Sequence, residues 1–253
     1  MRGNKKYDLV FSLGAACSCA QILIGANLRQ FSSPFDWLFG SDFLGRCKIL
    51  SDNFERFLEE KDLEYSYSER SISCDAYYNK YNKLTFNHDF ETKKELKETF
   101  PSVKEKYNRR INRLLENIKK AESILIVYIE TPDSQEHTTD KDIIAGWQQI
   151  HQQYPDKKID LLYIMNDNNL SFKQLSKENL SENITKIIAN YKSQSSKALP
   201  YEVNLSFLVH LLSEYRLNLP FIINLKKTIL KYGLCCIPIK KLRHELRKKY
   251  HVK

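Results

Sequence analysis

Three apolar runs constrain the fold of this chain more than any other feature. They read "YDLVFSL" (residues 7–13), "SILIVYIE" (123–130) and "KIDLLYIM" (158–165). Amphipathic helical patterns alternate with them, over about 17–28, 102–120 and 141–154. Continuous apolar strands joined through helices are typical of parallel sheets buried on both faces. The pattern therefore predicts an α/β fold, a three-layer sandwich around a mostly parallel sheet.

The 253 residues, 42% of them hydrophobic, suffice for one large domain. We expect an α/β catalytic domain over 1–199 and a mainly helical, basic extension over 200–253 packed on it. Between the apolar runs we expect loops and short helices over 32–57, a polar, tyrosine-rich stretch over 59–82 and a polar loop over 166–183.

The location predicted from composition is cytoplasmic. No run approaches 18 apolar residues, and "MRGNKKYDLV" turns polar too early for a secretory signal. The six cysteines match neither a disulfide framework nor a paired zinc pattern, so we expect free thiols and no metal.

The net charge of +9 is spread along the chain and concentrates only in "KKLRHELRKKYHVK" at the end. No nucleic-acid motif accompanies it, and we expect no nucleic-acid partner. Three interpretations of the end stay open: ordinary core, a solvated helix face, or a peripheral membrane contact through 221–253, at the inner face of the membrane. The sequence leaves the oligomeric state open.

Cys17 follows the first apolar run and opens the first helical pattern. The loop after the first strand of an open α/β sheet is a favoured ligand site. Unpaired amides at a helix start lower a thiol pKa and can hold an oxyanion, here near Ala15 to Ser18. Gly14 and Ala15 leave the approach uncrowded. The alternative is that Cys17 is a small buried side chain, as we expect for Cys19.

A nucleophilic thiol commonly needs a base. His88 ends the strand-like "KLTFNHDF" and precedes Asp89, whereas His137, in a polar loop after the central strand, is a second candidate. Asp36 stands among aromatic residues, where a carboxylate must find partners; it either accepts backbone N–H groups or orients His88. Further orienting or substrate-binding candidates are Ser12, Gly14, Ala15, Ser18, Arg29 and Trp37, although Trp37 also fits core packing.

The segments "SLGAACSCA", "LRQFSSPFDWLF", "FNHDF" and "YNRRINRLLENIKKAESILIVY", in that order, resemble a bacterial family of unknown function described as putative papain-like cysteine peptidases. The resemblance covers roughly residues 7–165. It implies that Cys17 and His88 are the catalytic pair, with Asp89 at a matching motif position. Relatives tend to carry an arginine after the central strand, where this chain has "IVYIET".

The same resemblance extends to capsule polysaccharide biosynthesis proteins of the acetyltransferase type. It implies a Cys-dependent acyltransferase that acts on a surface polysaccharide or its precursor, with acetyl-coenzyme A as donor and a glycan as acceptor. Candidates for the coenzyme A phosphates are Arg29, Lys48, Arg109 and Arg110. Two alternatives stay open: a papain-like peptidase or hydrolase, and a non-catalytic assembly factor for polysaccharide enzymes.

The order of elements differs from papain, in which the histidine lies in a separate β-rich half, far along the chain. Here a strand precedes the cysteine and an α/β pattern continues after the histidine. That order looks closer to hydrolases and acyltransferases with a strand–nucleophile–helix arrangement.

Overall fold

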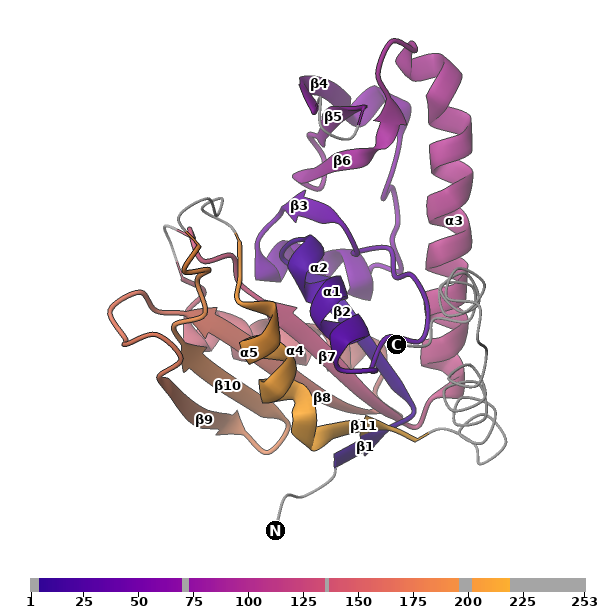
Figure 1. Cartoon of the computed structure of the whole chain (residues 1–253). Coiled ribbons are helices and arrows are strands. Elements are labelled where there is room, and N and C mark those ends of the chain that lie inside the picture. Colours follow the sequence, from indigo (N-terminus) through magenta and orange to yellow (C-terminus); the bar gives the residue numbers. More distant parts are fainter. Residues whose placement is uncertain (1–4, 70–72, 135–136, 196–201, 219–253) are drawn as a thin grey trace, which may run out of the picture. The chain divides into compact units, whose positions relative to one another are not determined.

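The computed structural model describes residues 5–69, 73–134, 137–195 and 202–218 (Figure 1). Most of the predicted extension, 219–253, lies outside the described residues, with Cys235, Cys236 and the basic end. The boundary between residues 199 and 200 stays a prediction. Within the described ranges, no helix combines the length and the apolarity that a membrane span would need.

A five-stranded sheet forms one centre of the fold, in the order β2-β7-β8-β10-β9. Strands β2 (Leu9–Gly14), β7 (Ser123–Ile129), β8 (Lys158–Asn166) and β10 (Ile184–Ala189) are parallel, and β9 (Leu175–Ser181) is an antiparallel edge. The three predicted apolar runs are β2, β7 and β8. The mixed α/β class and the mostly parallel sheet are thus confirmed.

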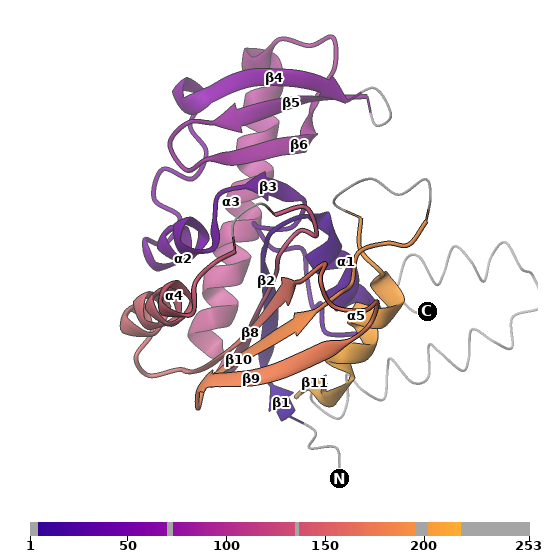
Figure 2. The same cartoon turned by 90° about the vertical axis from the view of Figure 1, so that its left-hand side faces the viewer.

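Helices cover the two faces of this sheet. Alternate strand residues pack against α1 (Cys17–Gly25) and α5 (Leu205–Leu211) on one face, and against α2 (Phe43–Ser51), α3 (Leu96–Lys120) and α4 (Asp140–Gln153) on the other. Val127 and Ile126, neighbours in β7, fall into the two different cores, as the two-residue period of a strand requires. Figure 2 shows α1 and α5 apart from α4 and α3.

A second, antiparallel sheet has the order β3-β6-β5-β4. It consists of β3 (Leu38–Gly40), β6 (Leu84–Glu91), β5 (Cys74–Asn79) and β4 (Leu63–Glu69), the last preceded by a short 3-10 turn, Glu60–Asp62. Helix α3 runs from the five-stranded sheet to this one (Figure 1). Its Tyr107 ring packs edge-on against Phe86 of β6. The core under β6 is therefore continuous with the core under the parallel sheet.

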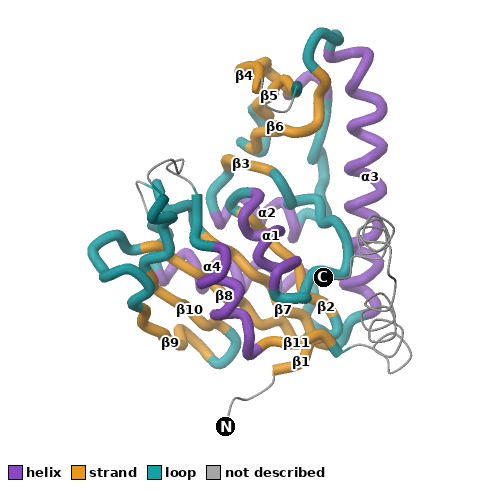
Figure 3. Tube along the Cα trace, in the orientation of Figure 1, coloured by secondary structure: helices purple, strands orange, loops and turns teal. Residues whose placement is uncertain are grey.

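Two expectations for the connecting segments need correction: the "polar loop" at 166–183 contains β9, and residues 32–57 contain β3 besides α2. The polar, tyrosine-rich stretch 59–82, for which the sequence predicted no element, contains β4 and β5. The segment after Pro200 begins with α5 and a 3-10 turn, Leu212–Glu214, and then forms a strand, β11 (Tyr215–Leu217). That strand pairs in parallel with β1 (Lys5–Tyr7) (Figure 3).

Candidate active site

Helix α1 begins at Cys17, after two residues that follow β2. Ala16 caps the helix in an extended conformation, and its side chain cannot bond to the first-turn amides. The backbone N–H groups of Cys17 and Ser18 lower the pKa of the half-buried Cys17 thiol. Burial raises that pKa by more than the amides lower it. The expected lowering of the thiol pKa is therefore not found, and the resting side chain is a neutral thiol.

Arg46 of α2 holds the loop that precedes Cys17. The guanidinium is fully buried, and it donates hydrogen bonds to five backbone carbonyls. Two of them flank Gly14: Leu13 O at 2.6 Å and Ala15 O at 3.2 Å. The others are on β3 and the residue after it, Leu38 O, Gly40 O and Ser41 O. Arg46 thus ties the end of β2 to the second sheet.

Gly14 has a function other than the one expected. A Cβ there would lie 2.1 Å from Arg46 Nη1, so the absent side chain makes room for the guanidinium. The amide of Gly14 donates to Ser12 Oγ at 2.9 Å, which identifies Ser12 as a structural residue of the same turn. Cys19, fully buried, donates to Val127 O at 3.7 Å, and burial raises its pKa to about 12, as expected of a packing thiol.

His88 is exposed on β6, in the antiparallel sheet. The Trp37 ring lies edge-on to the imidazole, with 5.8 Å between ring centroids. Asp89, the next residue, is largely buried, with a side chain that is 5% exposed, and it faces α3. Both Asp89 oxygens are engaged with α3: Lys106 Nζ bonds to Oδ1, and the Tyr107 hydroxyl donates to Oδ2 at 2.9 Å.

Asp36 is 2% exposed and forms an ion pair with Arg29, whose Nη2 and Nε lie 2.6 and 3.0 Å from Oδ2. The same oxygen accepts the amide of Ser33 at 2.9 Å. Burial raises the pKa of Asp36 by more than Arg29 lowers it. Of the two roles expected for Asp36, these contacts support holding the loop.

Among the predicted site residues the structure therefore brings together three pairs that the sequence did not predict as pairs: Ser12 with Gly14, Arg29 with Asp36, and Trp37 with His88. Cys17 is the first residue of α1, whereas His88 is on β6 of the antiparallel sheet, and among the described residues no hydrogen bond joins them. In the part of the chain that the structure describes, neither Asp36 nor Asp89 forms a hydrogen bond with His88.

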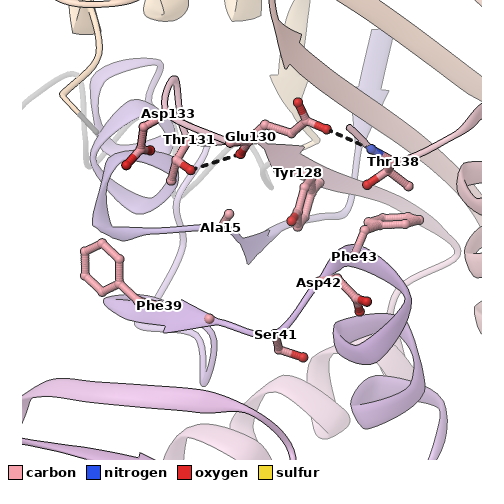
Figure 4. A pocket seen from close by; sticks show the side chains of 12 residues that line it. Ala15, Phe39, Ser41, Asp42, Phe43, Tyr128, Glu130, Thr131, Asp133 and Thr138 are labelled. Atoms are coloured by element: carbon pink, nitrogen blue, oxygen red, sulfur yellow. Dashed lines mark hydrogen bonds between the residues drawn. The ribbon is translucent and has the colours of Figure 1, made fainter. Parts of the chain in front are cut away.

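A pocket of about 400 Å³ opens beside the loop before Cys17 (Figure 4). The end of β7 and the following loop form one wall, the β3–α2 segment forms the opposite wall, and Ala15 and Tyr128 lie between them. This places the pocket at the carboxyl edge of the parallel sheet, where such folds bind ligands. Its lining residues are Ala15, Phe39, Gly40, Ser41, Asp42, Phe43, Tyr128, Glu130, Thr131, Asp133, Ser134 and Thr138.

Glu130, in that wall, is a buried polar centre that sequence reasoning missed. It is 4% exposed and accepts the Tyr163 hydroxyl at 2.6 Å, while His137 Nδ1 lies 2.8 Å from its other oxygen. Its signal in the sequence is that a charged residue ends the apolar run "SILIVYIE". His137, the second candidate base, thus has a carboxylate partner.

Comparison with protein families shows to which family the chain belongs. Residues 8–169 match the family described as "Putative papain-like cysteine peptidase (DUF1796)". The chain belongs to this family. The match extends from β2 to just past β8 and includes Cys17, His88, Asp89 and all of the residues that line the pocket.

One further relative is a protein of Acanthamoeba polyphaga mimivirus described as "Uncharacterized protein R408". It is 30% identical over 122 residues, which cover 42% of this chain and 54% of the viral protein. The chain thus matches about half the length of that relative. No solved structure matches. The comparisons support the papain-like part of the expected resemblance and do not support similarity to capsule acetyltransferases.

The basic residues expected to hold coenzyme A are partly engaged elsewhere. Arg29 pairs with Asp36, Arg109 pairs with Glu105, and the Arg110 guanidinium lies 5.3 Å from the centre of the Tyr107 ring. Lys48 lies in the last turn of α2. Within the described residues, no three His, Cys, Asp or Glu side chains are placed to hold a metal ion.

Proposed function

We propose that this family member is a cysteine-dependent hydrolase of peptide or related acyl bonds, with Cys17 as nucleophile. The observation that carries the proposal is the position of Cys17 at the start of α1, where two backbone amides face its sulfur, within the matched family region. Hydrolysis fits the family better than the acyl transfer to a glycan that the sequence had led us to expect.

The placement of His88 also supports a peptidase. The cysteine lies at a helix start beside one sheet, and the histidine lies on a strand of a separate, antiparallel sheet. Nucleophile and base on two different halves are the arrangement that papain-like peptidases use. The order of elements along the sequence alone favours hydrolases and acyltransferases with a strand–nucleophile–helix arrangement.

In the proposed reaction, His88 accepts the thiol proton as Cys17 Sγ attacks the carbonyl carbon. The amides of Cys17 and Ser18 stabilise the oxyanion of the tetrahedral intermediate. The C–N bond then breaks, and the imidazolium returns the proton to the departing amine. Water then attacks the thioester carbon while His88 takes one of its protons; the C–S bond breaks, the acid departs, and His88 returns that proton to the Cys17 sulfur. Because burial keeps the resting thiol neutral, proton removal has to accompany the attack.

His137 is the competing base, because its imidazole is held by Glu130, a residue that lines the pocket beside Ala15. Hydrolysis of a fluorogenic peptide library tests both assignments. We expect Cys17→Ala to abolish turnover and His88→Ala to lower kcat/KM by at least about 100-fold, the usual contribution of a general base. Loss of turnover in His137→Ala, with turnover retained in His88→Ala, would instead identify His137 as the general base.

Cys74→Ala is the matched control. Cys74 is another partly exposed thiol, on β5, and its replacement is expected to leave turnover unchanged. Thermal shift with acetyl-coenzyme A tests the acyltransferase alternative. Stabilisation of the protein by acetyl-coenzyme A, with no peptide hydrolysis, would contradict the proposal. An unchanged phenotype in cells that carry the Cys17→Ala protein would favour the alternative of a non-catalytic assembly factor.

A further inference from the structure

The pocket beside Ala15 is close to the proposed nucleophile, because Ala15 precedes Cys17 by two residues. A volume of about 400 Å³ accepts a single long side chain and falls within the range of ligand sites. The pocket therefore has the position and the size for a substrate side chain next to the scissile bond.

The lining carries carboxylates and aromatic rings but no cation. Asp42, Glu130 and Asp133 are its acidic residues, and none of the twelve lining side chains is Lys, Arg or His. The Phe39, Phe43 and Tyr128 rings also line it, and aromatic faces attract cations. The nearby Arg46 lies behind the loop, where five backbone carbonyls surround its charge.

Glu130 is held in place before any ligand arrives. The Tyr163 hydroxyl, His137 Nδ1 and, at 3.4 Å, the Thr138 amide fix the two oxygens of a carboxylate that is 4% exposed. Buried carboxylates are costly unless compensated, and in low dielectric they attract a cation more strongly than exposed ones. Glu130 thus fixes a negative charge in the pocket wall, with its carboxylate turned toward Thr138 (Figure 4).

Tyr128 places a hydrogen-bonding group in the pocket that is independent of the carboxylates. Its side chain is 5% exposed and lines the pocket, and its hydroxyl forms no hydrogen bond with any residue of the described ranges. Burial raises the pKa of Tyr128, so the hydroxyl stays protonated and keeps both a donor and acceptor sites. The hydroxyl oxygen itself is not fully buried, so it faces the open space of the pocket. A ligand N–H in the pocket can donate a hydrogen bond to it.

We propose that the pocket binds the positively charged side chain of a lysine or arginine in the substrate, next to the bond that Cys17 attacks. The inference rests on the proposed function for the position of that bond. The charge selectivity of the pocket itself rests only on Glu130, Asp133, Tyr128 and the aromatic walls.

Calorimetric titration of the Cys17→Ala protein tests binding without turnover. The probes are Nα-acetyl-arginine amide, Nα-acetyl-lysine amide and Nα-acetyl-citrulline amide, the last an uncharged mimic of arginine. We expect the two cationic probes to bind at least tenfold more tightly than citrulline. Glu130→Gln, added to Cys17→Ala, should weaken arginine binding at least tenfold, and Tyr128→Phe or Asp133→Asn at least threefold.

Asp156→Asn is the matched control, because it removes one exposed carboxylate next to the amino end of β8, at the opposite edge of the sheet. Its arginine affinity should equal that of the parent. Equal binding of arginine and citrulline, or unchanged arginine binding in Tyr128→Phe and Asp133→Asn, would overturn the inference. If Glu130→Gln does not fold, the arginine affinities of Tyr128→Phe and Asp133→Asn still test cation binding in the pocket.

Failure of the inference and failure of the proposed function give different results. Selective arginine binding without hydrolysis of any peptide would leave the pocket assignment standing and refute the hydrolase. Peptide hydrolysis by the wild-type protein with no preference for lysine or arginine, and no selective binding, would retain the hydrolase and refute the pocket assignment.

Discussion

The Arg46 guanidinium leaves no room for a side chain at Gly14, in the loop that precedes Cys17. A Cβ at residue 14 would lie 2.1 Å from Arg46 Nη1 and 2.6 Å from its Cζ, and Gly14 has a φ of +118°. Both the close approach and the backbone conformation therefore require glycine at this position.

Gly14→Ala is expected to destabilise the protein by about 2–4 kcal/mol, because overpacking and a positive φ each add to the cost. The free energy of unfolding in urea measures the effect. Gly25→Ala, at the end of α1 in ordinary helical backbone, is the control and should change that free energy by less than about 1 kcal/mol. Similar values for the two variants would contradict the packing of Arg46 against Gly14.

Replacement of Arg46 should be more damaging. Arg46→Met leaves several buried carbonyls without their donor, and a loss of more than about 3 kcal/mol is expected, since bonds from a charged donor are each worth about 1.5–3 kcal/mol. Arg46→Lys keeps the charge but not the planar fork, and it should recover only part of the stability. Full recovery in Arg46→Lys would show that charge alone, not the five carbonyl bonds, accounts for the stabilisation.

The Cys17 thiol should react slowly with alkylating agents near neutral pH. Burial raises its pKa above that of an ordinary thiol, so the reactive thiolate fraction at pH 7–8 is lower than in a free cysteine. Iodoacetamide labelling followed by peptide mass mapping, from pH 6 to pH 10, measures the site. The labelling rate should still rise at pH 9. A plateau below pH 7 would instead reveal a stable thiolate.

Asp89 is expected to stabilise the packing of β6 on α3 and not to orient His88. Asp89→Asn should lower the free energy of unfolding by about 1–3 kcal/mol, because the Tyr107 hydroxyl and Lys106 lose a charged partner. The pH profile of kcat/KM should keep its shape. A shift of the profile's acidic limb in Asp89→Asn would show that Asp89 acts through the imidazole.

The parallel sheet could be predicted from the sequence because β2, β7 and β8 are buried on both faces and read as uninterrupted apolar runs. Strand β9 could not, since it is an edge strand whose residues are nearly all exposed. Strand β4 alternates tyrosine with polar residues, and β5 has two adjacent tyrosines among polar residues, so neither strand forms an apolar run in the sequence.

The position of Cys17 at the start of a helix could be predicted from the same patterns. The residues around it could not, because Arg46 donates to backbone carbonyls and Glu130 accepts from Tyr163, which is far along the chain. Such contacts leave no spacing in the sequence. Asp36 and Asp89 likewise lie near aromatic or histidine residues in sequence, yet their partners Arg29, Lys106 and Tyr107 are set by the fold.

Covalent trapping at Cys17 tests the central claim most directly. A peptidyl vinyl sulfone adds to a catalytic thiol, and intact-protein and peptide mass spectrometry locate the adduct. We predict one adduct, on Cys17, whose formation is absent in Cys17→Ala, slowed at least about 100-fold in His88→Ala and unchanged in Cys74→Ala. Labelling of Cys17 at an equal rate in the wild-type and His88→Ala proteins, or labelling of Cys74 instead, would contradict the account.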